Sequence, residues 1–270
     1  MKKATKMISI IAAALIAVLC CGCGAKKDEG IKIGVQTTTT GDIYASGDFG
    51  EDAVTRFDSG AAAVEALKAG KVDCVIIDNE PAKSYVASNE GLTILETSYT
   101  EEEYAICFQK GSDMKNMVNS ALEALINDGS VQAIIDKYIN DEGEFSGVPV
   151  KFEDTDKPNL IMATNAEFPP YEYIDGDMYY GIDVEVAKII ADKLGYDLSI
   201  ENVSFDSIIP GVQSGKYTMG MAGLTVNADR IEKVDFSTSY ATGIQSVIVK
   251  SDSEKIKTYE DLEKYLLPTE

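Results

Sequence analysis

Apolar and polar positions along residues 31–139 follow a strand pattern and a helix pattern in turn. Lys32 to Gln36 predicts a strand, and residues 61–69 predict a short helix that Gly70 ends. The apolar run before Asp78 is typical of a buried parallel strand. Further along, the pattern predicts a helix over 81–88, strands over 92–95 and 104–108, and helices over 117–127 and 130–139, the last capped by Ser130 with Ile139 among its inward residues. This alternation favours an α/β fold.

The pattern stops at residues 140–158, an acidic stretch with Gly and Pro that shows no period and predicts a linker. It then restarts. Strands are predicted over 160–164 and 198–203, and a stiff aromatic loop over 165–173. An amphipathic helix should start near Ile182 and end at Gly195, a second helix should follow at 205–213, and the chain should finish with a strand before Lys250 and a helix over 259–266.

Two segments on either side of the linker resemble each other. ALKAGKVDCVIID ends at Asp78, and GVQSGKYTMGMAG ends at Gly223; each combines a helix, a Gly-Lys step and an apolar strand. The likeness is short for a repeat. It nevertheless indicates two similar lobes, with the two strand ends at one cleft, where open α/β sheets bind ligands.

The stretch Met219 to Arg230 (MGMAGLTVNADR) contains groups that suit a carboxylate. Gly223 permits close approach to the backbone, Thr225 offers a hydroxyl and an N–H, and Arg230 offers a planar two-pronged donor. Asn227 is a suitable helix N-cap. The alternative is an ordinary strand, turn and helix with a surface arginine.

Four consecutive threonines, Thr37 to Thr40, follow the first strand. They form either an anion-binding turn or a solvated polar turn that caps the next helix.

Composition excludes several classes of function. The formal charge of -21 makes nucleic acid and anionic membrane surfaces poor partners. Histidine is absent, so the usual zinc sites, Ser-His-Asp triads and Cys-His pairs are excluded. No phosphate-binding glycine loop or paired Cys-x-x-Cys motif occurs in the sequence. We therefore expect no metal and no cofactor.

The N-terminus is typical of a targeting segment. Three lysines precede an apolar stretch, residues 7–19, that is too short to span a bilayer. The following cysteines resemble a bacterial lipoprotein signal, with Cys23 as the predicted lipidated residue and Cys21 as second choice. This gives a signal peptide over 1–22, a tether over 23–30, and a lipid anchor on the outer face of the cell membrane. A plain secretory signal is the alternative. The two remaining cysteines, Cys74 and Cys107, are expected to be buried free thiols.

Eight motifs together resemble one family. They are ATNAEFPPYEY, GIDVEVAKIIADKLG, FDSIIPGVQSGK, MAGLTVNADR, VDFSTSYATG, KIGVQTTTTGDIYA, GKVDCVIIDNEPA and YTEEEYAICFQKGS. The chain resembles the extracytoplasmic solute-binding proteins of ABC importers for polar amino acids, family 3, from residue 31 to about 266. The resemblance implies a two-lobed, periplasmic-binding-protein-like (type II) α/β fold with a hinge and a cleft between the lobes.

The motif order differs from that of the family, in which the ATNAEF half precedes the IGVQ half. We therefore expect a circular permutant, in which the linker 140–158 joins the usual ends. The first lobe would comprise 99–243, and the second lobe 31–98 with 244–270. The alternative is a fragment of a tandem array whose halves pair between molecules.

The resemblance implies ligand-binding roles for particular residues. Arg230 would bind the ligand α-carboxylate with Thr225 and the N–H of Thr40, and Asp78 would accept the α-ammonium with the carbonyl of Gly223. Phe168 and Phe205 would stack on the ligand side chain, whose end would face Asn165 and Gln36. The whole predicted set is Gln36, Thr39, Thr40, Asp78, Asn165, Phe168, Phe205, Ala222, Gly223, Thr225 and Arg230.

Three positions depart from related sequences. Thr38 stands where the family usually has Gly, which alters the expected turn, and Thr218 stands where Asp is usual, at a position expected to be structural. Asn165 is neutral where binders of lysine and arginine often have Asp, and Glu167 could compensate. The pocket thus suggests a glutamine-like or basic amino acid.

The resemblance implies a binding protein without chemistry, which captures a free polar amino acid and delivers it to an ABC permease. One alternative is a relative of the cyclohexadienyl dehydratases on the same fold, for which the cleft offers only Asp78 and Glu167 as acids. Another is an amino-acid-sensing ectodomain, although no second span or output domain is seen in the sequence.

Overall fold

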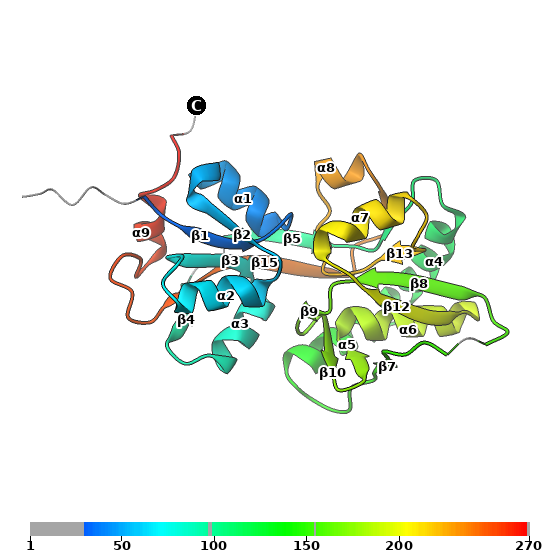
Figure 1. Cartoon of the computed structure of the whole chain (residues 1–270). Coiled ribbons are helices and arrows are strands. Elements are labelled where there is room, and N and C mark those ends of the chain that lie inside the picture. The colour runs from blue at the N-terminus through cyan, green and yellow to red at the C-terminus, as the bar shows by residue number, and fades with distance from the viewer. Residues whose placement is uncertain (1–29, 97–98, 154, 269–270) are drawn as a thin grey trace, which may run out of the picture.

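The computed structural model describes residues 30–96, 99–153 and 155–268, and it arranges them in two α/β lobes joined by two strands (Figure 1). The predicted signal peptide and Cys23 lie outside the described residues. Each lobe has its own central sheet with helices on both faces. The predicted two-lobed α/β fold is confirmed, whereas the circular permutation stays a prediction.

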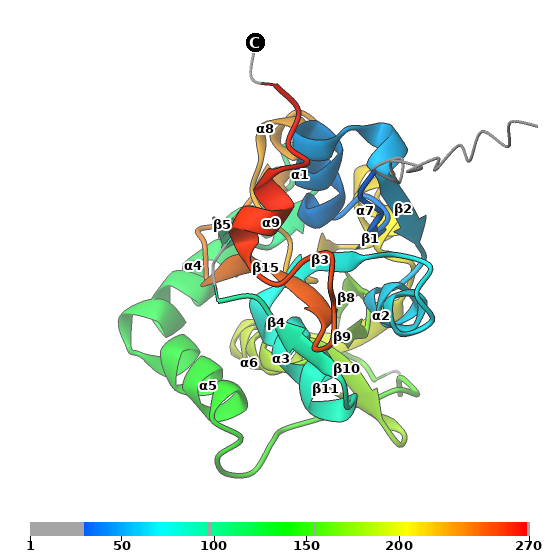
Figure 2. The ribbon, with the colours of Figure 1, turned by 90° about the vertical axis from the view of Figure 1, so that its left-hand side faces the viewer.

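One lobe, called here the β1 lobe, is built on a sheet of order β2-β1-β3-β15-β4, with β5 pairing β15. Its strands are β1 (Ile33–Gln36), β2 (Val54–Phe57), β3 (Cys74–Asp78), β4 (Leu92–Ile94), β5 (Thr100–Tyr104) and β15 (Ala241–Lys250). Its helices are α1 (Thr40–Phe49), the 3-10 turn η1 (Glu51–Ala53), α2 (Gly60–Lys68), α3 (Asn79–Ser88) and α9 (Tyr259–Glu263). Helices α1 and α9 pack on one face of the sheet, and α2 and α3 pack on the other (Figure 2).

The second lobe, called here the β8 lobe, has a sheet of order β12-β8-β13-β6-β14 and a small sheet of order β7-β11-β10-β9. The strands are β6 (Cys107–Phe108), β7 (Val148–Pro149), β8 (Asn159–Thr164), β9 (Glu167–Phe168), β10 (Glu172–Asp175), β11 (Met178–Tyr180), β12 (Asp197–Asn202), β13 (Met219–Gly220) and β14 (Asp235–Phe236). The helices are α4 (Asp113–Asn127), α5 (Ser130–Ile139), α6 (Ile182–Leu194), α7 (Phe205–Gln213) and α8 (Ala228–Ile231).

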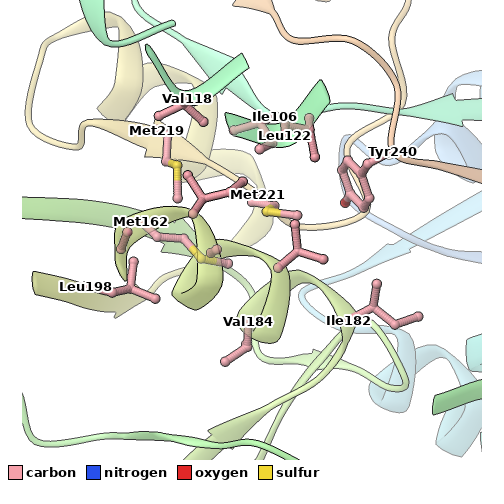
Figure 3. Close-up of a cluster of buried hydrophobic side chains, with 14 of the residues drawn as sticks. Ile106, Val118, Leu122, Met162, Ile182, Val184, Leu198, Met219, Met221 and Tyr240 are labelled. Carbon is pink, nitrogen blue, oxygen red and sulfur yellow. The ribbon is translucent and has the colours of Figure 1, made fainter. Parts of the chain in front are cut away.

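The largest core lies between the β8-lobe sheet and helices α4, α5 and α6. Figure 3 shows Met162, Met219, Met221, Ile182 and Val118 among the side chains of this core. All five side chains are fully buried. Because burial of one such side chain stabilises the fold by about 1.5–3 kcal/mol, this core holds the strands that end at the cleft in place.

Strands β5 and β15 connect the lobes. They run antiparallel, with Tyr104 opposite Ala241, Glu102 opposite Gly243 and Thr100 opposite Gln245. The chain leaves the β1 lobe along β5, builds the β8 lobe and returns along β15 (Figure 1). These two strands connect the lobes and are called here the hinge strands.

Two expected features at the cleft can be compared with the structure. The threonine run after Gln36 caps the next helix, as one of its two readings predicted, since the Thr39 side chain accepts from the Asp42 N–H at the start of α1. The predicted strand 104–108 is two strands, because the chain passes from one sheet to the other at Ala105.

Two further details of the predicted secondary structure are wrong. Gly129 rather than Ser130 is the N-cap residue of α5, and Ile139 is 42% exposed instead of facing inward. The linker also contains strand β7, which pairs with β11. Local sequence could not show this pairing, since its partner is a hairpin some thirty residues away.

Cys74 and Cys107 are both buried free thiols, as predicted. Within the described ranges, no helix is both long enough and apolar enough to cross a membrane.

Candidate ligand-binding site

A small cavity of about 20 Å³ lies between the two lobes, beside the strands that connect them. Both lobes contribute to its wall. Its lining residues are Gln36, Thr39, Thr40 and Asp78 from the β1 lobe, and Asn165, Phe168, Glu172, Phe205, Ala222, Gly223, Thr225 and Arg230 from the β8 lobe. All eleven residues of the predicted set thus surround one cavity, and Glu172 is an addition.

Arg230 is buried at one end of this cavity, with 5% of its surface exposed. Asn227 caps α8 as predicted, since its Oδ1 accepts from the Arg230 N–H at 2.9 Å. The guanidinium donates to the carbonyl oxygens of Thr225 (2.9 Å) and Thr38 (3.1 Å) and lies 5.4 Å from the centre of the Phe205 ring. Burial lowers the pKa of Arg230, and the negative charge of Glu102 opposes that shift. Its remaining N–H groups can bind a carboxylate.

The threonine turn meets Arg230 from the opposite lobe. Thr38 adopts a left-handed backbone conformation with φ 63°, the region that glycine enters most easily. A β-branched residue is strained in this conformation. Thr40 is the first residue of α1, where backbone N–H groups lack partners within the helix.

Asp78 ends β3 at the cavity and is 8% exposed. Its Oδ1 has no hydrogen-bond partner among the described residues. Burial, followed by the nearby charge of Glu102, raises the pKa of Asp78 well above its ordinary value. A cation at this point would satisfy the free oxygen and favour the carboxylate form.

Gly223 passes the cavity in a left-handed conformation with φ 55°. A Cβ atom there would lie 3.0 Å from Cε1 of Phe168, and the Gly223 N–H donates to Oδ2 of Asp183 at 2.9 Å. The residue must therefore stay a glycine for the Phe168 ring to remain in the cavity wall. Phe168 itself stacks on Tyr171, with ring centres 5.8 Å apart.

The two amides expected at the side-chain end bond to each other. Nε2 of Gln36 donates to Oδ1 of Asn165 across the cleft at 2.9 Å, and Nδ2 of Asn165 donates to the Val203 carbonyl at 3.0 Å. Glu167 is exposed and does not line the cavity, so it cannot compensate for the neutral Asn165. Gln36 Nε2 also donates to the Asp58 carbonyl at 3.2 Å, so both of its hydrogens are used, whereas its Oε1 accepts in none of these bonds.

Glu172 is the acid that sequence reasoning missed. Only 1% of it is exposed, and neither carboxylate oxygen has a hydrogen-bond partner within the described residues. Burial raises its pKa, and the nearby Asp183 raises it further. Asp183 accepts from the Tyr240 hydroxyl at 2.7 Å, and burial raises its pKa to about 6. Glu172 lies within the predicted aromatic loop, and its aromatic neighbours Tyr171 and Tyr173 were the only signal that it is buried.

Glu102 on β5 was also missed. It lies in a run of three glutamates, a pattern that predicts a solvent-exposed segment. In strand β5, however, Glu102 is buried, whereas Glu101 and Glu103 are exposed. Its Oε2 accepts from the hydroxyls of Thr40 and Thr225. The alternating exposure of a strand could have indicated the burial.

Residues 160–266 match the family described as bacterial extracellular solute-binding proteins, family 3. The arginine-binding extracellular protein ArtP of Bacillus subtilis is 38% identical over 106 residues, 39% of this chain and 41% of that protein. The ABC transporter arginine-binding protein 1 of Escherichia coli is 31% identical over 104 residues, 38% of this chain and 42% of that protein. The chain spans about two fifths of the length of the curated relatives it matches.

Solved structures include similar chains as well. The arginine-bound form of domain 1 from TmArgBP is 28% identical, with a TM-score of 0.30 over 40% of this chain and 86% of that one. The ligand-binding core of GluR0 with L-glutamate is 13% identical, with a TM-score of 0.44 over 88% of this chain and 91% of that one.

A cleft between two α/β lobes, lined by one buried arginine and two buried carboxylates, is typical of a small-molecule binding site. More narrowly, residues 160–266 match the model of the bacterial extracellular solute-binding proteins, family 3. This match supports the predicted family over those residues. The two relatives described above are named as binding proteins, which agrees with the prediction of a binding protein rather than an enzyme.

Proposed function

We propose that this protein is the substrate-binding component of an ABC importer and that it captures a cationic amino acid outside the cytoplasm. The family match and the arginine-binding relatives support the class of ligand. The charges around the cavity support the cationic member of that class.

The α-carboxylate of the ligand would lie at Arg230. The guanidinium is held by two carbonyls, one from each lobe, and by the Phe205 ring. The N-terminus of α1 at Thr40 adds backbone N–H groups and a favourable dipole. A buried carboxylate needs such pairing, because an unpaired buried charge costs several kcal/mol.

The α-ammonium would lie at Asp78, whose Oδ1 is buried without a partner. Asp78 comes from the β1 lobe and Arg230 from the β8 lobe. A zwitterion can therefore bridge the lobes only when the cleft is closed, so its binding favours closure.

The observation that carries the proposal is the balance of buried charge. Arg230 is the one buried lysine or arginine among the described residues, whereas Asp78, Glu102, Glu172 and Asp183 are buried at or beside the cavity. A zwitterion leaves this excess of carboxylates unchanged. A lysine- or arginine-like side chain reduces it. Glu172, whose pKa is raised by burial, would be ionised by such a second cation beside it.

The cellular setting follows from the sequence predictions. The N-terminal signal and lipidated Cys23 would tether the protein to the outer face of the membrane, where it would deliver its ligand to an ABC permease. Circular permutation would account for the order of the lobes, with each lobe completed within one chain.

The test is isothermal titration of the full chain with L-arginine, L-lysine, L-glutamine and L-glutamate. We expect L-arginine or L-lysine to bind most tightly, and a ligand at about a thousand times its Kd to add about 4 kcal/mol of stability in a melt. Tighter binding of L-glutamine than of either cation would refute the cationic class. A folded protein that binds none of the four would refute the proposed function.

A further inference from the structure

Glu102 stands on hinge strand β5, between the two exposed glutamates Glu101 and Glu103. Its side chain points inward and is 5% exposed. On the paired hinge strand β15 it faces Gly243, where an added Cβ would collide with the Tyr104 hydroxyl. The hinge is thus closely packed where Glu102 projects from it.

One oxygen of Glu102 receives three hydrogen bonds from three parts of the molecule. Oε2 accepts from the hydroxyl of Thr40 in the β1 lobe (3.0 Å), from the hydroxyl of Thr225 in the β8 lobe (2.9 Å) and from Nε2 of Gln245 on β15 (3.2 Å). Both threonines line the ligand cavity. Glu102 therefore joins the two walls of the cleft directly.

We propose that Glu102 is a positioning residue, which couples closure of the lobes to ligand capture by holding one threonine hydroxyl from each wall. The effect of Glu102 on ligand affinity rests on the proposed function. Its effect on the closed arrangement of the lobes does not depend on any ligand.

The bonds to Glu102 also set the direction of the threonine hydroxyls. A hydroxyl has one proton, and here each proton is donated to the carboxylate. The hydroxyl oxygens of Thr40 and Thr225 therefore present only lone pairs to the cavity. They can accept from an ammonium but cannot donate to a carboxylate, which leaves carboxylate binding to Arg230 and the backbone N–H groups.

Closure is linked to the same oxygen. Thr40 and Thr225 move with different lobes, so a rotation that opens the cleft must lengthen at least one of their bonds to Oε2. A buried acceptor that loses its donors is destabilised, which makes opening less favourable. Glu102 thereby shifts the lobes toward the closed state before a ligand arrives, and pre-organisation of this kind raises apparent affinity.

The first experiment is a mutant cycle on the full chain. Thr40→Val and Thr225→Val are made singly and together, in the native background and with Glu102→Leu, and the denaturant midpoint is measured without ligand. We expect the two threonine changes to be non-additive in the native background and additive with Glu102→Leu. Thr40→Ser and Thr225→Ser keep the hydroxyl and should behave like the native protein.

The second experiment measures lobe closure and affinity. In small-angle scattering without ligand, Glu102→Leu should give a larger radius of gyration than the native chain. Its Kd for L-arginine should rise roughly 5- to 150-fold, the usual range for coupling between sites, mainly through faster dissociation. Glu101→Leu and Glu103→Leu, on the same strand but exposed, are the matched controls and should change neither quantity.

Additive threonine changes in the native background would overturn the proposal, and this outcome can be read even if Glu102→Leu does not fold. An unchanged radius of gyration in folded Glu102→Leu would overturn it as well. If L-arginine does not bind the native chain, the proposed function fails, while the ligand-free cycle and scattering still decide the role of Glu102.

Discussion

The two ends of the cavity were not equally accessible to sequence reasoning. At the end proposed for the α-carboxylate and α-ammonium, Arg230 and Asp78 were expected, and both lie in the cavity wall. At the proposed side-chain end, Gln36 and Asn165 line the cavity as expected but also bond to each other, and the unexpected Glu172 has oxygens without a hydrogen-bond partner among the described residues. The chemistry of one end is common to all amino acids, whereas the other end depends on how side chains meet across the lobes.

The largest effect is expected when Arg230, the proposed partner of the ligand carboxylate, is removed. Arg230→Ala should weaken binding of L-arginine by about 3–5 kcal/mol, because the bound carboxylate stays buried without its partner. Titration calorimetry measures the loss. Lys233→Ala is the matched control, since Lys233 is exposed three residues away at the mouth of the cleft and should have little effect. Native affinity in folded Arg230→Ala would refute the carboxylate assignment.

The next effect concerns Asp183, whose Oδ2 accepts a hydrogen bond from the N–H of Gly223 in the cavity wall. Its pKa is raised to about 6 in the folded protein, so its contribution to stability is fully present below its unfolded pKa near 3.8 and is lost as pH rises through about 6. The size of this change is on the order of 3 kcal/mol.

Denaturant unfolding between pH 4 and pH 6.5 should show a decline to which Asp78 and Glu172, whose pKa values are also raised, contribute, and Asp183→Asn should make it shallower. Asp192→Asn changes an exposed acid on the same helix and serves as the control. An unaltered slope in Asp183→Asn would contradict the assignment of this titration to Asp183.

A third change tests whether Glu172 selects a ligand with a cationic side chain. Glu172→Gln should reduce affinity for L-arginine and L-lysine by roughly 1.5–3 kcal/mol, the worth of a hydrogen bond to a charged group, and should leave neutral amino acids almost unaffected. Competition binding gives the selectivity directly. Glu167→Gln, at the exposed acid nearby, should leave selectivity as it is. Equal losses of affinity for charged and neutral amino acids would mean that Glu172 does not discriminate between their side chains.

The smallest effect is expected for Phe168, which contributes an uncharged aromatic wall to the cavity. Phe168→Ala should weaken every ligand by about 1 kcal/mol, since one aromatic wall is lost, and should keep the order of preference among amino acids. The same competition assay applies. A reversal of that order would show that Phe168 contributes to charge selection through its contacts with Gly223 and Tyr171.

The sequence alone was sufficient for most of the fold. Periodicity located α2, α4, α6 and β3 to within a few residues, because each is set by local burial of apolar side chains. It missed α1, which begins inside the threonine run and buries Thr40, Gly41 and Asp42 rather than a clear apolar face.

The contacts across the cleft could be determined only from the tertiary structure. Gln36 meets Asn165 from 129 positions away, and Thr225 reaches Glu102 from 123. No local pattern encodes such pairs, because they depend on how two separately folded sheets are held by the hinge strands. Most of the residues that line the cavity could therefore be found in the sequence. Which of their atoms already bond within the protein, and which buried acids lie beside the cavity, followed from the packing of the lobes.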